Sequence, residues 1–445
     1  MRNKLYALFM AFVLSLFSLP GFAPGRGDLV SYVSSRATSL EDSADLDHLI
    51  SLAADRKLVL LGEASHGTHE FYAWRDSISR RLIAEKGFDF IVVEGDWASL
   101  YALNRYVKNM PGAHSTAREA LEDLQRWPLW MWANEEVVAL AEWLRQHNDE
   151  LPPEDRVGFY GMDVYGEWHS MGEVLAFLQA HDEAVYEMAA GYYACFDNFG
   201  EDSWLYARLA ARGEVNCASE VESVVGLFRE NMGKLEQLPE YQMFYGKQNA
   251  LVVKHAERFY RKAVVHPDAS SWNSRVHYMS LTVDRLLGLY GLESKGIVWA
   301  HNTHIGDARF SEMGSHGQDN IGQLSRLDYG PESVFLIGFS TYTGRVKAGS
   351  EWGGRRQRMQ VPRARPGSIE AIFEQTGLER FQLVFDDDDR THEAFNRPYG
   401  NRAIGVVYDP GGDHLRNYVQ SIVPMRYDAL LFFRESRALT PLHRR

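Results

Sequence analysis

The amino-acid sequence predicts an α/β fold, in which a mostly parallel central sheet is flanked by helices, carries a large helical insertion and opens a cleft at the carboxyl ends of its strands. Two observations predict this fold. Short apolar runs alternate repeatedly with stretches whose apolar residues recur at helical spacing. A long segment in the middle of the chain then shows helical spacing alone. Strands that alternate with helices form parallel sheets with both faces covered, so the first observation predicts the core and the second the insertion.

The first unit of strand and helix lies near the amino terminus. Residues 57–61, Lys-Leu-Val-Leu-Leu, form a short apolar run that ends in Gly-Glu63-Ala-Ser-His66. A helix is predicted behind it, because apolar residues from Phe71 to Leu82 recur at near-helical spacing. We expect the later strands at residues 88–94, 157–163, 295–301, 333–339, 403–408 and 427–433.

The segment of residues 166–292 has no convincing strand pattern. Its apolar residues recur at helical spacing, for example Val174 with Leu178 and Met279 with Val283. We therefore expect a helical subdomain over about 166–292. The later stretch of residues 355–366 is rich in Arg and Pro and is expected to be a loop.

The amino terminus has the pattern of an export signal. Arg2 and Lys4 precede an apolar run over residues 5–23, as in a secretory signal peptide. We expect residues 1–27 to be this signal peptide, with its cleavage position and an uncleaved anchor left open, and residues 28–445 to be periplasmic or secreted. No later stretch approaches the roughly 20 apolar residues that span a bilayer, so no further membrane contact is expected.

Composition excludes several kinds of partner and site. The 445 residues carry a formal net charge of -13, which is unsuited to nucleic acid because phosphate binding needs clustered Lys and Arg. Cys195 and Cys217 are the only cysteines, too few for a disulfide framework or a thiolate zinc site. A single bridge and two buried free thiols are both consistent with the sequence. Nothing in it specifies an oligomeric state.

Titratable side chains follow four of the predicted strands, at the edge where ligands bind in open parallel sheets. Such side chains are rarely buried without partners, so their coincidence indicates a site in the predicted cleft. They are Glu63 and His66 after the first strand, Glu94 and Asp96 after the second, Asp163 after the third, and His301, His304 and Asp307 after the fourth.

A histidine at such a site can act as a base. Its unperturbed pKa is about 6.5, so the neutral ring can take a proton from water near neutral pH. His66 is the candidate, and Glu63 or Glu94 would fix its tautomer and stabilise the cation that it becomes. Attack on an ester also needs a donor or a cation at the developing oxyanion. The candidates for that second role are Arg75, His301 and His304.

Two other chemistries lack their motifs. A serine nucleophile elbow needs Gly-x-Ser-x-Gly, and the segment around Ser65 has Glu63 in place of the first Gly. No Gly-x-Gly-x-x-Gly and no phosphate-loop lysine occurs at a strand-to-helix turn, so nucleotide binding has no support.

A metal-dependent hydrolase of a peptide or ester is the main alternative. The same carboxylate and imidazole side chains are ones that zinc, iron or manganese accept, although no His-Glu-x-x-His helix is present. A non-catalytic protein that holds a ligand in the cleft is a third hypothesis. In the metal-dependent alternative, the metal ligands would be Glu63, His66, His301 and His304.

Two histidine segments resemble the signature of the erythromycin esterase family. They are Leu61-Gly-Glu-Ala-Ser-His66-Gly-Thr-His-Glu-Phe71 and Val298-Trp-Ala-His301-Asn-Thr-His304-Ile-Gly-Asp307-Ala-Arg309. Supporting segments include Val93-Glu94-Gly95, Trp130-Met-Trp132 and Gly161-Met-Asp-Val-Tyr165, and the resemblance covers roughly residues 40–443.

The resemblance implies an α/β core around a deep cleft, and a hydrolase that needs neither metal nor cofactor. The histidine at the position of His66 would activate water to open a small-molecule ester or a macrolide lactone. Family members that confer macrolide resistance are usually regarded as cytoplasmic, whereas this chain carries an export leader. The resemblance therefore predicts hydrolysis more firmly than it predicts a macrolide substrate. The remaining catalytic residues would be Glu63, Arg75, Glu94, His301 and His304.

Overall fold

The computed structural model describes residues 26–231, 238–266 and 268–442. All but the last two residues of the expected signal peptide lie outside these ranges. Most of the strands form one central sheet of nine. The strands are β1 (Thr38–Ser39), β2 (Leu58–Leu61), β3 (Phe90–Asp96), β4 (Gly158–Asp163), β5 (Gly296–Trp299), β6 (Val334–Gly349), β7 (Arg356–Val361), β8 (Arg380–Val384), β9 (Tyr399–Arg402), β10 (Tyr418–Ser421) and β11 (Ala429–Ser436).

The sheet is parallel through its centre. Its order is β1-β8-β11-β6-β2-β5-β3-β4, and every neighbouring pair from β11 to β4 is parallel. Antiparallel pairs occur where β8 joins β11, where β1 joins β8 and where β7 joins the far half of β6. The mostly parallel sheet predicted from the sequence is therefore confirmed.

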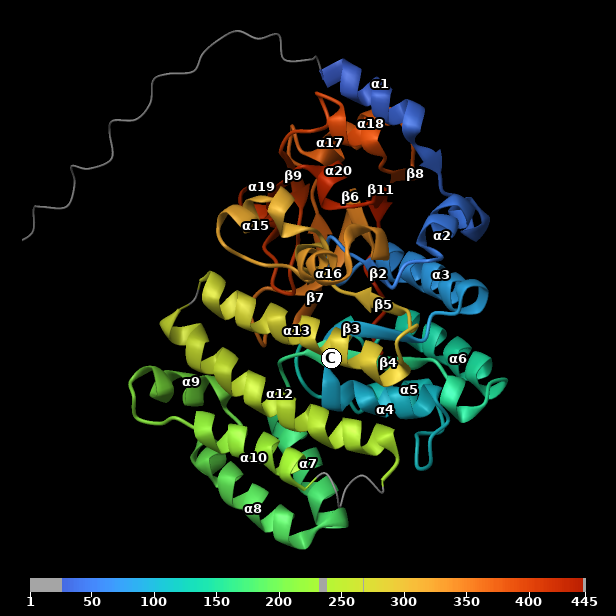
Figure 1. The fold of residues 1–445 in the computed structure, drawn as a ribbon. Helices are drawn as coiled ribbons and strands as arrows, with labels where there is room; N and C mark the ends of the chain where they lie inside the picture. The colour runs from blue at the N-terminus through green and yellow to red at the C-terminus, as the bar shows by residue number, and fades with distance from the viewer. Residues whose placement is uncertain (1–25, 232–237, 267, 443–445) are drawn as a thin grey trace, which may run out of the picture.

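Helices surround this sheet and extend well beyond one side of it (Figure 1). Among the residues that the structure describes, no helix is both long and apolar enough to span a bilayer. The helices are α1 (Arg26–Arg36), α2 (Asp47–Ala53), α3 (His69–Lys86), α4 (Trp97–Val107), α5 (Ala117–Glu122), α6 (Glu135–Asp149), α7 (Glu167–His181), α8 (Glu183–Tyr193), α9 (Ser203–Ala211), α10 (Ala218–Glu230), α12 (Glu240–Val265), α13 (Ala269–Tyr290), α14 (Asn302–Ile305), α15 (Glu312–Ser315), α16 (Ile321–Tyr329), α17 (Ile369–Phe373), α18 (Asp387–Thr391), α19 (Asp413–Arg416) and α20 (Val423–Arg426).

Alternate residues of each inner strand enter two separate cores. Leu58 and Leu60 of β2 belong to one apolar cluster, whereas Val59 and Leu61 belong to the other. Because side chains alternate along a strand, one core lies on each face of the sheet. Helices α3 and α6 contribute to one core and α7 and α13 to the other. Burial on both faces explains why these strands read as continuous apolar runs.

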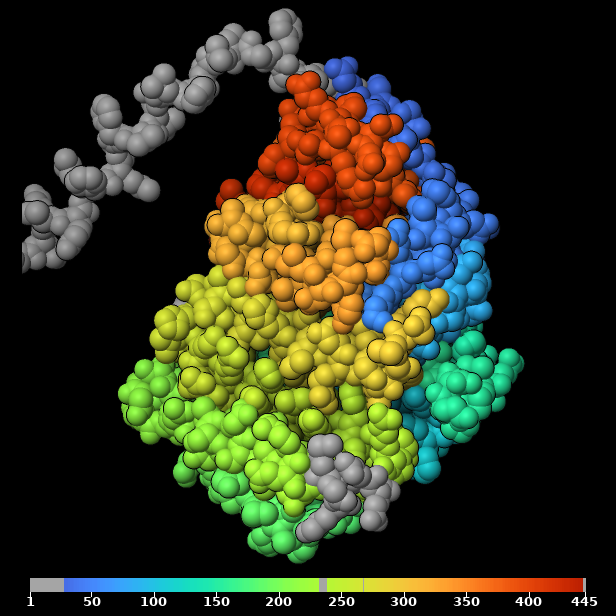
Figure 2. Space-filling view, in the orientation of Figure 1, coloured from blue at the N-terminus to red at the C-terminus, as the bar shows by residue number. Residues whose placement is uncertain are grey.

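The chain between β4 and β5 contains only helices and turns in its described part, so the predicted helical insertion is confirmed. It fills the lower part of Figure 1. On the face that Figure 2 shows, its last helix packs against the orange segment that follows β5, and α13 contacts α16 there. Within the insertion Cys195 and Cys217 form a disulfide, with Cα atoms 5.9 Å apart. This resolves the two alternatives for the cysteines in favour of a bridge.

The strand expected at residues 403–408 is wrong. Strand β9 ends at Arg402, and the next residues make only isolated bridges, from Ile404 to Ser65 and from Val407 to Gly349. These bridges lead the segment across the carboxyl edge of the sheet, where Ala403 and Val406 line a cavity. An apolar run that covers a cavity has the same composition as a buried strand, so pattern alone did not separate the two.

The loop expected at residues 355–366 is partly wrong, because β7 occupies Arg356–Val361. This strand pairs with the end of β6, which continues ten residues beyond the predicted strand end at residue 339. Only Met359 and Val361 of β7 are buried. One side of a hairpin that faces solvent needs few apolar residues, so the Arg-rich composition concealed the strand.

The loop that carries His66 passes very close to β6. Gly67 O accepts a hydrogen bond from Lys347 N at 3.0 Å, and a Cβ at residue 67 would lie 2.0 Å from Lys347 O. We expect Gly67→Ala to lower the free energy of unfolding by about 1–3 kcal/mol, as overpacking does. Urea denaturation followed by circular dichroism measures this change.

Gly172→Ala is the matched control. Gly172 lies within α7, and a Cβ there meets nothing within 4 Å. Alanine favours the helix over glycine, so this variant is expected to gain about 0.5–1 kcal/mol. Equal stability of the two variants would contradict the close approach at Gly67.

Candidate active site

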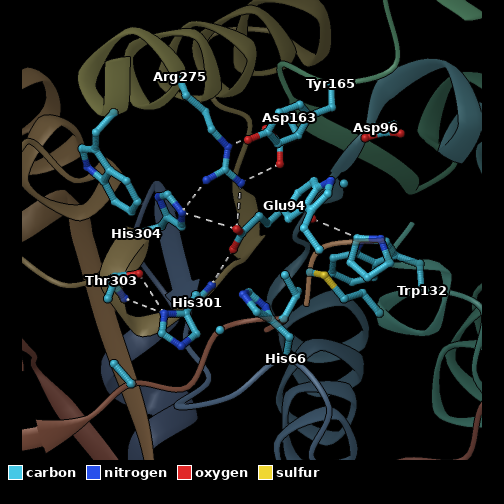
Figure 3. A pocket seen from close by; sticks show the side chains of 18 of the residues that line it. His66, Glu94, Asp96, Trp132, Asp163, Tyr165, Arg275, His301, Thr303 and His304 are labelled. Atoms are coloured by element: carbon cyan, nitrogen blue, oxygen red, sulfur yellow. Dashed lines mark hydrogen bonds and ion pairs between the residues drawn. The ribbon is translucent and has the colours of Figure 1, made fainter. Parts of the chain in front are cut away.

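The ends of four parallel strands bring the predicted site residues together. Their order β2-β5-β3-β4 makes them neighbours in the sheet, although they are far apart in the sequence. Figure 3 shows Glu94 at the centre, between the imidazoles on one side and Arg275 and Asp163 on the other. The site residues come from the β2 loop (Glu63, His66), from β3 (Glu94), from β4 (Asp163) and from the β5 loop (His301, His304).

Glu63 holds the ring of His66. Its Oε1 lies 2.9 Å from His66 Nδ1, and Tyr72 donates its hydroxyl hydrogen to His66 O at 3.0 Å. A carboxylate accepts hydrogen bonds only, so the proton of the neutral ring sits on Nδ1 and the lone pair on Nε2. Burial alone would lower the pKa of His66, but the charges of Glu94 and Glu63 outweigh it and raise the pKa above 6.5.

Arg75 forms an ion pair with Glu63, at the carboxylate oxygen that does not contact His66. Its Nη2 donates to Glu63 Oε2 at 2.9 Å, and its guanidinium lies 4.4 Å from the ring centre of Tyr72 and 4.6 Å from that of Trp299. Arg75 is completely buried and does not line the cavity. It therefore cannot touch a substrate oxyanion, which corrects the hypothesis that it does so, and its place fits a positioning role.

Glu94 connects the two halves of the site. Its Oε2 accepts the backbone N–H of His301 at 2.9 Å, and its Oε1 lies 2.8 Å from Arg275 Nη2 and 3.3 Å from His304 Nε2. Burial alone would raise the pKa of Glu94, but the charges of His304, His66 and Arg275 outweigh it and hold the pKa well below its usual range. Glu94 is therefore a fixed negative charge beside His66.

The two later histidines face the cavity in different ways. His301 lies with its ring centre 4.8 Å from that of His66, and its Nδ1 is 2.8 Å from Thr303 Oγ1. Burial and the charge of His66 hold the pKa of His301 well below 6.5, so this ring is neutral. His304 stacks on Trp272, with ring centres 4.6 Å apart and planes 5° apart. Both rings are thereby fixed.

Arg275 is the site residue that sequence reasoning missed. It projects from α13 of the helical insertion, and it binds Asp163 through Nε at 2.8 Å and through Nη2 at 2.6 Å. Its Nη1 lies 3.1 Å from His304 Nε2. Arg275 follows the buried Ser271 by four residues and precedes the buried Tyr278 by three, so it falls on the buried side of its helix. An arginine on such a face was the available signal.

Two other carboxylates at strand ends form ion pairs with arginines that do not contact the histidines. Asp96 is bound by Arg126 through two hydrogen bonds of 2.6 and 2.7 Å. Asp307 is fully buried and is paired with Arg309 at 2.7 Å and with Arg326 at 3.2 Å. Asp307 does not line the cavity, so it is not part of the site although it follows the same strand as His301 and His304.

These residues form the floor of a cavity of about 600 Å³, a size typical of sites for drug-sized ligands. His66, Glu94, Arg275, His301 and His304 all line it, whereas Glu63 and Arg75 lie beneath it. Other residues that line it come from three parts of the chain: Leu129, Met131 and Trp132; Trp272, Glu312, Met313 and Gln318; and Trp352, Val406 and Val419.

The carboxylates of the site are fully engaged by protein groups. Each oxygen of Glu63 and each oxygen of Glu94 has a cationic or N–H partner. In the described part of the chain, no three His, Cys, Asp or Glu side chains are grouped so that they could hold a metal ion.

A family model and a known protein sequence both match this chain. The family model for erythromycin esterase matches residues 83–436. This range contains Glu94, Arg275, His301 and His304 and begins after His66. An Escherichia coli protein named erythromycin esterase type II is 22% identical over 366 residues, which are 77% of this chain and 83% of that protein.

Solved structures share the fold. A Bacillus cereus protein superposes with a TM-score of 0.79 at 20% identity, over 95% of this chain and 100% of that one. A protein described as a succinoglycan biosynthesis protein gives 0.75 at 19% identity, over 93% and 98%. A mutant of the erythromycin esterase EreC in its open conformation gives 0.62 at 15% identity, over 89% and 95%.

Proposed function

The chain belongs to the erythromycin esterase family, and from this premise we propose that it hydrolyses a carboxylic ester or lactone with a water molecule that His66 activates. The observation that carries the proposal is the contact of 2.9 Å between His66 Nδ1 and Glu63 in a ring that lines the cavity. It leaves Nε2 with a lone pair at the place where a base is needed.

The reaction follows from this tautomer. His66 Nε2 takes a proton from water while the water oxygen forms a bond to the carbonyl carbon, and the carbonyl π electrons move to the oxygen. The tetrahedral intermediate then collapses, the bond to the alcohol oxygen breaks, and the proton on His66 passes to that oxygen. Glu63 and Glu94 stabilise the imidazolium between the two steps, and Arg75 holds the Glu63 carboxylate in place.

Arg275 supplies the donor for the developing oxyanion in this proposal. A guanidinium has five N–H groups. Its Nε–H and both Nη2 hydrogens are used by Asp163 and Glu94, and His304 Nε2, 3.1 Å from Nη1, can accept at most one Nη1 hydrogen. One N–H on Nη1 is left, on a side chain that lines the cavity. A preorganised donor of this kind stabilises the transition state more than the ground state.

The pH dependence follows from the environment of His66. The imidazole of His66 must be neutral to act as a base, and its pKa lies above 6.5 because Glu94 and Glu63 favour the cation. We expect kcat/KM to rise with pH and to reach half of its plateau above pH 6.5. Initial rates between pH 5 and 9 with one ester measure this limb. A rate that is flat or falling across neutral pH would argue against His66 as the base.

Mass spectrometry of substrates incubated with the purified protein tests the proposed function. The panel contains erythromycin, simple esters and simple lactones, each with and without a chelator. A gain of one water molecule that survives the chelator supports the proposal. Turnover that is lost with the chelator and restored by zinc or manganese would favour the metal-dependent alternative. A ligand that binds in stoichiometric amount and stays unchanged would favour the binding protein.

We also propose that the protein is exported and acts in the periplasm or outside the cell. The proposal is supported by the leader pattern at residues 1–27 and by the disulfide between Cys195 and Cys217, since stable disulfides form in oxidising compartments. The mass of the protein recovered from a periplasmic extract tests it. Recovery of the whole chain in the cytoplasm only would refute it.

A further inference from the structure

The active-site cavity has an apolar rim that the reaction itself does not use. Trp352 lies at the turn between β6 and β7, lines the cavity and is 53% exposed. Val406 and Leu129 line the cavity as well. A tryptophan side chain offers a large apolar surface, and here roughly half of that surface is uncovered beside a charged floor.

The position of this ring is fixed by its neighbours. Its centre lies 4.7 Å from that of Trp127, which in turn packs at 5.2 Å against Trp130. Trp127 also donates its Nε1 hydrogen to Gly354 O at 3.0 Å, which ties the hairpin turn to the loop of residues 126–132. The last residue of β6 before the turn is Gly349, whose N–H donates to Val406 O and so holds the turn. The exposed ring is therefore a preformed surface.

The rest of the cavity combines a charged floor with apolar side chains that are mostly buried. On the floor, Glu94 and Arg275 bind each other at 2.8 Å. Glu312 and Gln318 also line the cavity. An ester whose carbonyl lies at His66 can therefore remove more apolar surface from water at Trp352, which is 53% exposed, than at Met131, Trp132 or Met313, which are 5–6% exposed.

We propose that Trp352 determines specificity by binding the apolar body of a bulky ester or lactone whose carbonyl lies at His66. This rests on the proposed hydrolase function. A cavity of about 600 Å³ has room for a substrate of that size. Short esters reach the floor without reaching the rim, so they gain nothing from the ring.

The test compares p-nitrophenyl acetate with p-nitrophenyl octanoate. In Trp352→Ala we expect kcat/KM for the octanoate to fall roughly tenfold or more, as loss of apolar burial of this extent predicts, and kcat/KM for the acetate to stay unchanged. Trp352→Phe is expected to retain most of the preference. The control is Trp204→Ala, because Trp204 on α9 is 41% exposed but does not line the cavity; it should change neither rate.

A loss of the same size for both esters, or no loss for either, would overturn the inference while hydrolysis stands. A binding measurement tests the apolar subsite at Trp352 separately from the hydrolase function. Calorimetry with methyl octanoate on His66→Gln protein, with and without Trp352→Ala, is expected to show roughly tenfold weaker binding in the double variant. If wild-type protein hydrolyses neither ester but this loss of affinity is seen, the hydrolase proposal fails and the apolar subsite stands. Unchanged affinity overturns the subsite.

Discussion

Replacement of His66 by Gln is expected to lower kcat/KM for an ester by about 10²- to 10⁴-fold, the usual contribution of a positioned general base. The amide of Gln cannot hold a proton taken from water. It can still donate a hydrogen bond to Glu63, which now receives one from His66 Nδ1 at 2.9 Å, so the loop keeps its anchor. Steady-state rates and thermal unfolding of the same preparation measure the two properties.

His69→Gln is the matched control for this variant. His69 lies three residues later at the start of α3 and is also paired with a carboxylate, since its Nδ1 is 2.7 Å from Glu136 Oε1. Its ring does not line the cavity, so kcat/KM is expected to stay at the wild-type value. Turnover retained in a folded His66→Gln protein would remove the base from the mechanism. Equal losses in both variants would point to damage of the loop.

Replacement of Arg275 by Gln is expected to lower kcat by about 10²- to 10³-fold, the usual effect of removing an oxyanion donor. KM should change little, because the donor acts mainly in the transition state. The variant also leaves Asp163 and Glu94 without a shared cation, so the pKa of Glu94 is expected to rise. Rates across pH, together with unfolding temperature, distinguish the lost donor from lost stability.

Two further arginine variants sharpen this test. Arg275→Lys keeps a positive charge but loses the planar fork that binds Asp163 and Glu94 together, and its rate should lie between those of wild type and Arg275→Gln. Arg126→Gln removes a second guanidinium beside Tyr165. The guanidinium of Arg126 lies 4.6 Å from the centre of the Tyr165 ring, and that of Arg275 lies 5.3 Å from it. If Arg126→Gln reduced kcat as much, general positive charge rather than a donor would explain the effect.

The strand ends were the most predictable part of the site. Period and apolar content placed β2, β3, β4 and β5, and ligands bind at the carboxyl edge of such sheets, so the proximity of Glu63, His66, Glu94, His301 and His304 followed from topology alone. The direction in which a side chain points does not follow from topology. Arg75 is one of three candidates for the oxyanion donor in the sequence, and in the structure it lies behind Glu63, because the buried face of α3 turns it toward Trp299.

The helical insertion was predicted as an element but not as a part of the site. Helical spacing shows which residues of α13 are buried, and it does not show which strand end they meet. Arg275 and Asp163 are separated by 112 residues, and no local motif joins them. The strand prediction for residues 403–408 was wrong for a related reason, since covering a cavity and forming a buried strand require the same apolar side chains.

The place of β2 in the sheet has a consequence for how the protein is made. Leu58 pairs on one side with Gly296 and on the other with Val334, so a growing chain that already contains the His66 loop has not yet produced either strand that holds it. Closing such long loops between parallel strands is slow, whereas the helices of the insertion form from local contacts. In refolding from urea we therefore expect far-ultraviolet circular dichroism to recover well before esterase activity, and simultaneous recovery of the two signals would show that the sheet assembles as early as the helices.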